Sequence, residues 1–393
     1  MKVGIYNQPA EGGIGGSEVS AAVLAEALVL EQHQIDIVHH KPYLNRERLA
    51  EISNTDLSNV RLREVAVEPF SFGSTHNPWR RYEEAVNWQR ALSEPYDLFI
   101  NFTHGFPPFC HARRGALVVL FPFNEAPHYR LDRRPRLKGL NALKDAYHKW
   151  EWRKRLASYH HKTAISQFSR DWTMRRWGVD CEVIYPPVDT RLEVGAKENI
   201  ILSVGRFTVT GHSKKQLEMM TSFSELEKEL TGWEYYSIGG VSGVLEDAEY
   251  FDSVASVAKN CRAHVVGNLE PRRLSELYGR AKLFWHAAGY DEDDSRPELS
   301  EHFGIATVEA MSAGCVPVVI DKGGQREIIE HGVSGFLWNT LQDLKRYTEL
   351  LLRDEQLRAE MGKAARSRAA TFSRTNFVAR FKRLLTDSGR LPH

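Results

Sequence analysis

Short, continuously apolar runs alternate along the chain with longer segments in which apolar residues recur every three or four positions. A continuous apolar run is typical of a strand buried on both faces of a parallel sheet, whereas the wider spacing is typical of a helix packed on that sheet. The first run, residues 2–6, leads through a glycine-rich loop at 12–16 into a predicted helix with apolar positions Val19, Ala22, Val23, Ala25 and Leu28. Further buried strands are predicted at 35–38, 97–102, 115–120 and 162–166.

A second series of apolar runs follows, at 199–205, 233–240, 264–267, 281–285 and 316–320. Between the two series stand Pro186 and Pro187, and adjacent prolines disfavour a helix and suit a rigid linker. The sequence therefore predicts an α/β protein with two tandem Rossmann-like domains and an interdomain cleft. The expected domains are 1–188 and 189–372, with a last helix at about 373–393 that packs back on the first domain.

Two glutamates, Glu301 and Glu309, flank a turn at Gly304 that precedes a predicted helix ending at Gly314. Their spacing places both carboxylates near the start of one helix. The backbone N–H groups of a first helical turn are unpaired and attract an anion or a polar ligand. Because carboxylates accept hydrogen bonds from hydroxyls, the expected partners are hydroxyls of a sugar or a ribose.

Basic residues follow the strand predicted at 199–205, namely Arg206, Lys214 and Lys215. An arginine and a lysine at the carboxyl end of a strand can hold a diphosphate and neutralise charge on a nucleoside-diphosphate leaving group. A solvated basic loop is the alternative, and it would be preferred for an isolated pair. The position after a central strand favours the diphosphate site, because open α/β sheets bind ligands there.

Other motifs are weaker. The loop at 12–16 lacks the third glycine of a dinucleotide fingerprint, and a plain tight turn fits it as well as a binding role does. The acidic run 291–294 contains a D-x-D spacing that could hold a divalent metal, but a solvated loop is the simpler interpretation. His104 follows a predicted strand, and His128 lies in a polar segment; either could serve as a polar anchor, although most of the sixteen histidines are expected to be structural or exposed.

Residues 130–155 contain ten Lys or Arg and three Asp or Glu, interleaved with aromatic residues. Such a segment can rest on an anionic membrane surface or hold a phosphorylated lipid, and a solvated helix face with core aromatics is the alternative.

Length and composition agree with a soluble protein of two domains: 393 residues, 42% hydrophobic and 26% charged. The net charge of +1 argues against a nucleic-acid partner. The four cysteines lack metal-ligand spacing and suit a reducing compartment. No signal-peptide core or membrane-spanning run is present in the sequence, so a cytoplasmic protein is expected, with peripheral contact at the inner face of the membrane through 130–155.

Four segments together resemble glycosyltransferase family four, whose members are retaining enzymes with the two-Rossmann-domain GT-B fold. The resemblance covers essentially the whole chain and is most specific in the order and spacing of its motifs. They are the strand-to-helix junction 163–169, the linker 183–189, Gly205-Arg206-Phe207 with Lys214, and Glu301-x7-Glu309 with 313–319.

The resemblance implies a hexosyltransferase that uses a nucleoside-diphosphate sugar as co-substrate, with no cofactor and no metal. The first domain would bind the acceptor, with Gly15 and Gly16 lining the cleft, and the second would bind the donor. Glu301 would bind sugar hydroxyls, and Glu309 the ribose hydroxyls. Arg206 and Lys214 would stabilise the leaving diphosphate, and the remaining donor contacts would come from the backbone of Phe303, Gly304 and Ile305.

The chain departs from the family pattern in two places. Lys214 follows Arg206 by a longer gap than usual, so 211–213 resembles an insertion and Lys215 could take the diphosphate role, although counting forward to Phe223 favours Lys214. The family's acceptor-side histidine is absent from 120–124, which leaves Asn124 or His104 as substitutes.

The alternatives are a non-catalytic nucleotide-sugar-binding or scaffold protein and a sugar-nucleotide epimerase. A scaffold protein would be expected to have lost one of the charged site residues, and an epimerase needs further acids and bases. A phosphorylase would need a pyridoxal-binding lysine, and an oxidoreductase a better glycine fingerprint. The donor sugar and its base stay open. The acceptor also stays open among a glycan, a lipid-linked saccharide and a small molecule.

Overall fold

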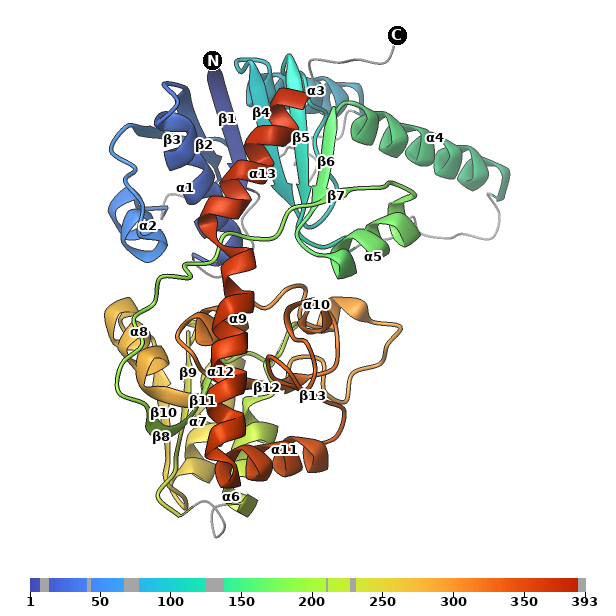
Figure 1. Ribbon diagram of the computed structural model, residues 1–393. Helices are drawn as coiled ribbons and strands as arrows, with labels where there is room; N and C mark the ends of the chain where they lie inside the picture. Colours follow the sequence, from blue (N-terminus) through green and yellow to red (C-terminus); the bar gives the residue numbers. More distant parts are fainter. Residues whose placement is uncertain are drawn as a thin grey trace. The chain divides into compact units, whose positions relative to one another are not determined.

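The computed structural model describes residues 1–7, 14–40, 44–66, 78–123, 138–209, 211–226 and 231–387, and Figure 1 shows its ribbon. The chain divides into two compact units. Unit 1 comprises residues 1–184 and the segment from Val378, and unit 2 comprises 185–377.

The division falls after Ile184 rather than after the predicted residue 188, because the linker pairs with unit 2. Val188 forms a parallel bridge with Ser373, and the Tyr185 ring lies edge-on to Phe372 at 5.0 Å between centroids. The last helix begins at Arg374 in unit 2, and its residues from Val378 belong to unit 1.

Unit 1 is built on a parallel sheet of seven strands in the order β3-β2-β1-β4-β5-β6-β7. The central strands β1, β4 and β5 are mostly apolar and almost entirely buried, as predicted from their apolar runs. The strands are β1 (Lys2–Asn7), β2 (Gln34–His39), β3 (Val60–Glu64), β4 (Leu98–Thr103), β5 (Arg114–Val119), β6 (His161–Ala164) and β7 (Glu182–Val183).

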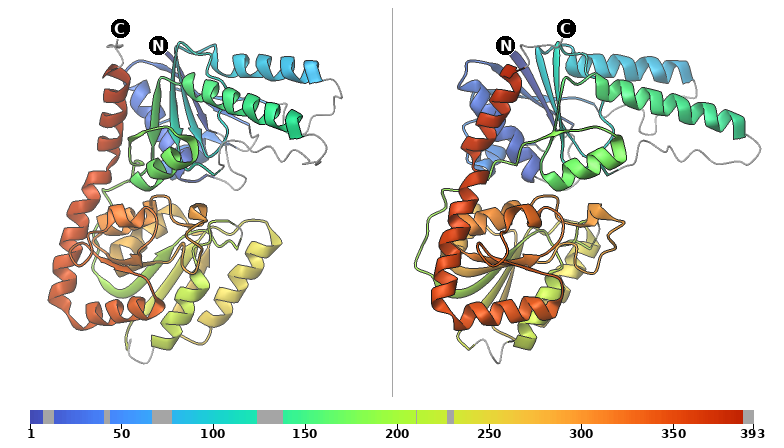
Figure 2. Two further views of the ribbon diagram at one scale, coloured as in Figure 1. Left: turned by 90° about the vertical axis from the view of Figure 1, so that its right-hand side faces the viewer. Right: turned by 45° about the vertical axis from the view of Figure 1, so that its right-hand side comes forward.

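The helices of unit 1 begin and end at recognisable signals. For example, the Ser166 hydroxyl accepts a hydrogen bond from the Ser169 N–H at the start of α5, and Gly178 ends that helix in the left-handed conformation. In both views of Figure 2, α3 and α4 run side by side. The helices are α1 (Gly16–Val29), α2 (Arg46–Ser53), α3 (Pro78–Ser93), α4 (Lys138–Ala157), α5 (Gln167–Trp177) and α13 (Arg374–Asp387).

Unit 2 has a parallel sheet of six strands in the order β10-β9-β8-β11-β12-β13. Its core is rich in large side chains with almost no exposed surface, among them Phe223, Tyr235, Trp285 and Trp338. The strands are β8 (Glu198–Val204), β9 (Glu234–Gly239), β10 (Ala263–Gly267), β11 (Ala281–His286), β12 (Val316–Ile320) and β13 (Phe336–Trp338).

The helices of unit 2 connect these strands in the alternating order that a doubly wound sheet requires. They are α6 (Gln216–Leu226), α7 (Leu245–Ala258), α8 (Pro271–Arg280), α9 (Ile305–Ser312), α10 (Gln325–Ile328), α11 (Leu341–Arg353) and α12 (Glu355–Ala369). Short 3-10 turns cover Pro297–Leu299 and Ala370–Phe372.

The predicted fold class, two tandem Rossmann-like domains, is confirmed by the two parallel sheets. Three strands, β3, β7 and β13, were not predicted; each lies at the edge of its sheet, where one side has no partner strand and the apolar pattern is short or broken. The expectation that both Glu301 and Glu309 stand near the start of one helix is wrong in part. Glu301 precedes α9, and Glu309 lies past its middle because α9 has only eight residues.

Each sheet has a point at which the strand order reverses, and this is where open α/β sheets bind ligands. In unit 1 the reversal falls between β1 and β4, and in unit 2 between β8 and β11. Loops that leave the carboxyl ends of these neighbouring strands turn toward opposite faces of the sheet. A ligand-binding site in unit 2 is therefore expected at the loops after β8 and β11.

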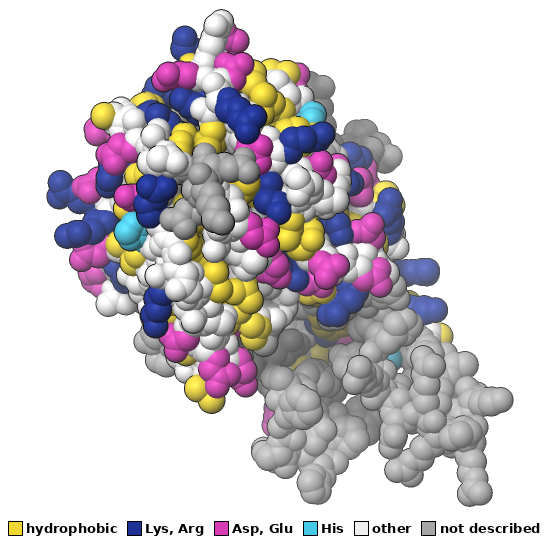
Figure 3. Space-filling view, turned by 90° about the horizontal axis from the view of Figure 1, so that it is seen from below, with side chains coloured by type: hydrophobic (Ala, Val, Ile, Leu, Met, Phe, Trp, Pro, Cys, Tyr) yellow, Lys and Arg dark blue, Asp and Glu magenta, His cyan; other side chains and the backbone are white. Residues whose placement is uncertain are grey.

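The molecular surface has no dominant sign of charge on the face drawn in Figure 3, where basic and acidic side chains are interspersed. This agrees with the net charge of +1. Within the described ranges, none of the helices combines the length and apolar character that crossing a bilayer requires.

A turn between β12 and α10 packs directly on the backbone before α9, and Gly324 makes that approach possible. A Cβ added at Gly324 would stand 2.5 Å from Phe303 Cα and 2.7 Å from the His302 carbonyl oxygen. We expect Gly324→Ala to destabilise unit 2 by about 1–3 kcal/mol, because the neighbouring backbone must shift. Urea unfolding followed by tryptophan fluorescence measures the change.

Gly243→Ala is the matched control, because an added Cβ there meets nothing within 4 Å. Its unfolding midpoint should be unchanged or slightly raised, since alanine reduces the entropy of the unfolded chain. Equal midpoints for the two variants would contradict the packing argument.

Candidate functional site

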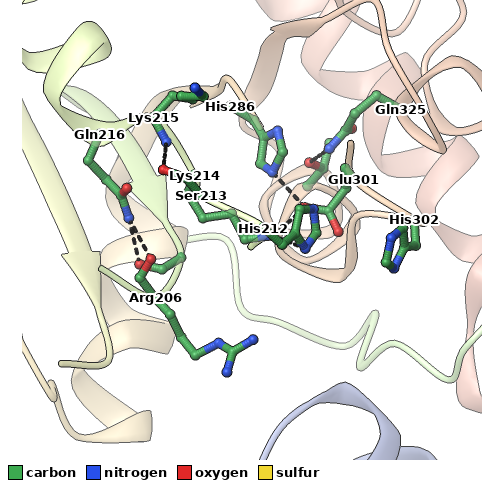
Figure 4. A network of polar contacts seen from close by, with 12 residues as sticks. Arg206, His212, Ser213, Lys214, Lys215, Gln216, His286, Glu301, His302 and Gln325 are labelled. Atoms are coloured by element: carbon green, nitrogen blue, oxygen red, sulfur yellow. Dashed lines mark hydrogen bonds and ion pairs between the residues drawn. The ribbon is translucent and has the colours of Figure 1, made fainter. Parts of the chain in front are cut away.

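Polar side chains from three segments of unit 2 converge at the carboxyl ends of β8 and β11 (Figure 4). Lys214 comes from the loop after β8, His286 is the last residue of β11, and Glu301 stands in the loop before α9. These segments are far apart in sequence, and the sheet topology brings them together. The cluster therefore occupies the reversal point of the unit 2 sheet.

The Glu301 carboxylate is the centre of this cluster. Its Oε2 atom lies 2.7 Å from Lys214 Nζ, 2.9 Å from His286 Nε2 and 3.9 Å from His212 Nε2. Its Oε1 atom accepts no hydrogen bond from the residues that the structure describes. One oxygen is thus fixed by the protein, and the other keeps its capacity to accept.

The polar groups around Glu301 determine its ionisation. Burial alone would raise its pKa, but Lys214, His212 and His286 outweigh burial and hold the pKa well below its usual range. The carboxylate is therefore ionised at neutral pH and acts as an acceptor only.

Three histidines, His212, His286 and His302, lie around the Lys214–Glu301 ion pair, and none of them was predicted from the sequence as a site residue. Burial, and then the charge of Lys214, lowers the pKa of His212 well below its ordinary value, and burial also lowers that of His286. Both rings are neutral at pH 7, and His286 donates its Nε2–H to Glu301. The His212 ring stacks on His302 with centroids 5.0 Å apart. The one available sequence signal was the position of His286 directly after a predicted strand.

The structure brings Lys214, and not Lys215, to Glu301. Gly205 makes room for the Lys214 side chain, since a Cβ there would stand 2.6 Å from Lys214 Cγ. The Lys215 ammonium instead lies 2.7 Å from a Glu292 carboxylate oxygen. The buried Gln216 side chain donates to the carbonyl oxygens of Gly205 and Arg206, both at 3.0 Å, and so fixes the loop after β8.

Arg206 is the second residue after β8, and its side chain is exposed. In Figure 4 no dashed line joins its guanidinium to any of the other residues drawn. Among the described residues it has no hydrogen-bond or ion-pair partner. Its five N–H donors are therefore available to a ligand.

The start of α9 supplies backbone donors beside Glu301. Gly304 has φ +121°, a conformation that side-chain-bearing residues rarely adopt. The N–H groups of Gly304, Ile305 and Ala306 donate to no group within the described ranges. Phe303 is buried, and its ring stacks on Tyr185 at 5.5 Å. The turn thus presents unpaired N–H groups next to the stacked rings of Phe303 and Tyr185.

Glu309 has different surroundings. Burial raises its pKa to about 7, although the Tyr278 hydroxyl donates to its Oε2 atom at 3.0 Å and thereby opposes the rise. Asp189 raises the pKa further, and Arg374 lowers it. Glu309 therefore gains or loses a proton near neutral pH.

The candidate residues of unit 1 lie at the reversal point of its own sheet. Gly15 and Gly16 stand at the start of α1, where the Gly15 N–H donates to Glu18 at 2.8 Å. His104 follows β4, half-buried, with its ring 5.0 Å from that of Phe123. Asn124 and His128 lie outside the described residues.

The acidic run 291–294 is used in local contacts. Glu292 pairs with Lys215, Asp294 lies 3.0 Å from Lys322, and Asp293 accepts from the Ser295 N–H. In the part of the chain that the structure describes, no group of three or more His, Cys, Asp or Glu side chains has an arrangement suited to a metal ion.

Chemically, the assembled site offers two kinds of contact. Arg206, Lys214 and the free N–H groups before α9 are donors suited to phosphate oxygens. Glu301 Oε1 and the Glu309 carboxylate are acceptors suited to hydroxyls. A ligand that carries both a diphosphate and vicinal hydroxyls matches this set.

Two family models match consecutive parts of the chain. The model described as Glycosyltransferase Family 4 matches residues 14–192, and the model described as Glycosyl transferases group 1 matches residues 189–368. Together they span residues 14–368, which include parts of both units and the charged residues of the candidate site.

Curated relatives match over part of their length. A GDP-Man:Man(3)GlcNAc(2)-PP-Dol alpha-1,2-mannosyltransferase from Dictyostelium discoideum is 28% identical over 230 residues, which are 54% of this chain and 43% of that protein. A sulfoquinovosyl transferase from Arabidopsis thaliana is 28% identical over 206 residues, which are 49% of this chain and 36% of that protein. The chain spans less than half the length of these two relatives.

Solved structures match over the whole chain. A Rickettsia africae glycosyltransferase superposes with a TM-score of 0.68 at 16% identity, covering 98% of this chain and 99% of that chain. The Anabaena protein HepE, solved with UDP and glucose, gives the same TM-score, identity and coverage. These likenesses show a shared GT-B fold. The two family models, which together match residues 14–368, show that the chain belongs to glycosyltransferase family four.

Proposed function

We propose that this protein is a retaining glycosyltransferase that moves a hexose from a nucleoside-diphosphate sugar to an acceptor hydroxyl without a metal ion. The observation that carries the proposal is the Glu301 carboxylate, fixed through Oε2 by Lys214 and His286 while Oε1 keeps its acceptor capacity. Beside it, Arg206 has an exposed guanidinium with no partner in the described part of the chain. The protein's acceptor for sugar hydroxyls and its donors for phosphate oxygens thus stand together at the carboxyl ends of β8 and β11.

Each group then has a role in donor binding. Glu301 Oε1 accepts from hydroxyls of the donor sugar, and the N–H groups of Gly304 and Ile305 meet sugar and phosphate oxygens. Glu309 accepts from the ribose hydroxyls. Lys214 and Arg206 neutralise the charge that grows on the leaving diphosphate, the role that a divalent cation has in metal-dependent transferases.

The proposed reaction retains the configuration of the anomeric carbon. The acceptor oxygen forms a bond to the anomeric carbon on the face from which the diphosphate departs, so the configuration of that carbon is retained. The bond between the carbon and the diphosphate oxygen breaks, and the acceptor's proton passes to that oxygen. No dedicated protein base is required, and catalysis depends on stabilising the leaving group in the transition state.

The relatives bear on the substrates. Two of them act, by name, on a dolichol-linked saccharide and in sulfoquinovose transfer, and HepE was solved with UDP and glucose. The acceptor classes for this chain are a glycan, a lipid-linked saccharide or a small molecule. Contact with a membrane surface would come from the described end of the 130–155 segment, where Tyr147 and Trp150 on α4 are exposed beside Lys149 and Arg153.

The donor site can be tested by thermal shift against a panel of nucleoside diphosphates and their sugars, with and without EDTA. One nucleotide should raise the melting temperature regardless of EDTA, because a ligand that binds only the native state stabilises it. Arg206→Ala should lose most of that shift, and Arg272→Ala, an exposed arginine on α8, should retain it. The absence of a shift with every nucleotide would refute the proposal.

Nucleotide affinity should depend on pH through Glu309, whose pKa of about 7 is raised by burial. Since the ionised carboxylate is the better acceptor for two ribose hydroxyls, protonation weakens binding as the pH falls. At pH 6 about nine-tenths of a group with this pKa is protonated, so Kd should rise about tenfold between pH 8 and pH 6.

Calorimetry with wild type and Glu309→Gln checks this dependence. Ionisation of the ligand affects both proteins equally, so it cancels when their pH ratios of Kd are compared. The variant should bind more weakly at pH 8 and show a smaller change in Kd between the two pH values. An identical pH ratio for both proteins would exclude Glu309 as the titrating group.

Membrane contact can be tested by sedimentation with vesicles that contain anionic lipid. We expect Tyr147→Ala with Trp150→Ala to lower the bound fraction several-fold, because amphipathic aromatic rings anchor proteins at bilayer interfaces. Met174→Ala removes a comparably exposed apolar side chain from α5 and serves as the control. Equal sedimentation of the double variant and wild type would argue against α4 as the contact.

A further inference from the structure

A second feature of unit 2 is a cavity of about 280 Å³ whose lining is strongly basic. It lies between the start of β8, the start of β11, the end of α9 and one face of α12. Five cationic side chains and one carboxylate line it, with a floor of Val194, Gly314, Ala359 and Gly362. The charged lining residues are Lys197, Lys282, Arg358, Lys363, Arg366 and Glu355.

Three of the five cations are held in place by uncharged protein groups. The Lys197 ammonium donates to the carbonyl oxygens of Ala281 and Ala313, each at 2.7 Å. Arg358 donates to the Leu351 carbonyl, and Lys282 donates to Asn199. Since these partners carry no net charge, the positive charges are fixed in position but not neutralised.

The one carboxylate in the lining, that of Glu355, does not neutralise the five positive charges. Glu355 is 86% exposed and lies 3.6 Å from Arg358 Nη2, so its charge is screened by water and already shared with one cation. Burial lowers the pKa of Lys197, and the charge of Arg366 lowers it further. Burial and Arg358 likewise lower the pKa of Lys282. The cavity therefore carries an uncompensated positive potential.

Lys363 and Arg366 supply the donors that a ligand could use. They stand three residues apart on α12, so they share a face of that helix, and both are exposed. Within the described residues, neither forms a hydrogen bond or ion pair. Lys197 and Arg358 each have a structural role, because they donate hydrogen bonds to backbone carbonyl oxygens. Lys363 and Arg366 have no such role among the described residues.

The cavity is separate from the donor site. Gly314 follows the last turn of α9, whereas Glu301 and Gly304 precede the first turn of the same helix. A Cβ added at Gly362 would stand 3.0 Å from the Gly314 carbonyl oxygen, so α12 packs closely on this end of α9 and closes the floor. Occupation of the cavity therefore does not compete with a nucleotide for the same side chains.

We propose that this cavity is a second anion site, which binds a small molecule bearing one or more phosphate groups. Its volume accommodates a phosphate with a small organic group, and its apolar floor accommodates that group. Lys363 and Arg366 donate to the phosphate oxygens, and Lys197, Lys282 and Arg358 provide the fixed positive potential.

Calorimetric titration with inorganic pyrophosphate tests this site in the Arg206→Ala protein, in which the proposed diphosphate contact of the donor site is removed. We expect saturable binding in that background. Adding Lys363→Ala and Arg366→Ala should weaken Kd at least tenfold, because two charge-assisted contacts are lost. Adding Arg272→Ala and Arg273→Ala, two exposed arginines on α8, is the matched control and should leave Kd unchanged.

Two further arms separate the sources of phosphate. Titration with glycerol 3-phosphate presents a free metabolite, and vesicles containing phosphatidic acid present a lipid headgroup; loss of either interaction in the Lys363 and Arg366 variants supports the site and identifies its source. The proposal is refuted if the Arg206→Ala protein binds no pyrophosphate, or if the α12 double substitution binds as tightly as the α8 control. A failure of the donor-site proposal leaves this test unaffected, because it is performed without Arg206.

Discussion

One ionised carboxylate organises unit 2: that of Glu301, held through a single oxygen by Lys214 and His286. A buried charge is costly unless it is paired and hydrogen-bonded, so the carboxylate requires both partners to stay in place. Lys214 is 87 residues away in sequence, and only the adjacency of β8 and β11 brings the two together. The sheet topology and the ion pair therefore depend on each other.

The two glutamates of one short motif have opposite electrostatic properties. Both are largely buried, yet Glu301 has a pKa well below its usual range and Glu309 has a pKa of about 7. The difference arises because cationic and donor nitrogens face Glu301, whereas Glu309 meets a neutral Tyr278 hydroxyl and the like charge of Asp189. The motif thus supplies two carboxylate acceptors. The residues packed around each one determine whether it stays ionised or titrates near neutral pH.

Much of the fold was predictable because buried parallel strands are continuous apolar runs, and ten of these runs coincide with strands of the structure. The edge strand β3 was missed because arginines interrupt its apolar pattern. Counting forward to Phe223 favoured Lys214 over Lys215, but the separate partners of the two lysines were not predictable, because they depend on the left-handed turn at Lys215 and on Glu292. The contacts of His212 and His286 with Glu301 were likewise invisible, since each joins residues from different loops.

Helix α9 links the two charged regions of unit 2 by its own electrostatics. Its eight residues span about 12 Å, and the N–H groups at its start make that end positive while the carbonyl groups at its end are negative. The free N–H groups favour an anionic ligand beside Glu301, and the Ala313 carbonyl holds the Lys197 ammonium at the opposite end. Lys197, which stabilises the end of the helix, also lines the second cavity, where Glu355 beside Arg358 is the one carboxylate in the lining. The need for a cation at the carbonyl end of α9 therefore accounts for Lys197 in the lining of the second cavity. It does not account for Lys363 and Arg366, which bind no carbonyl of that helix.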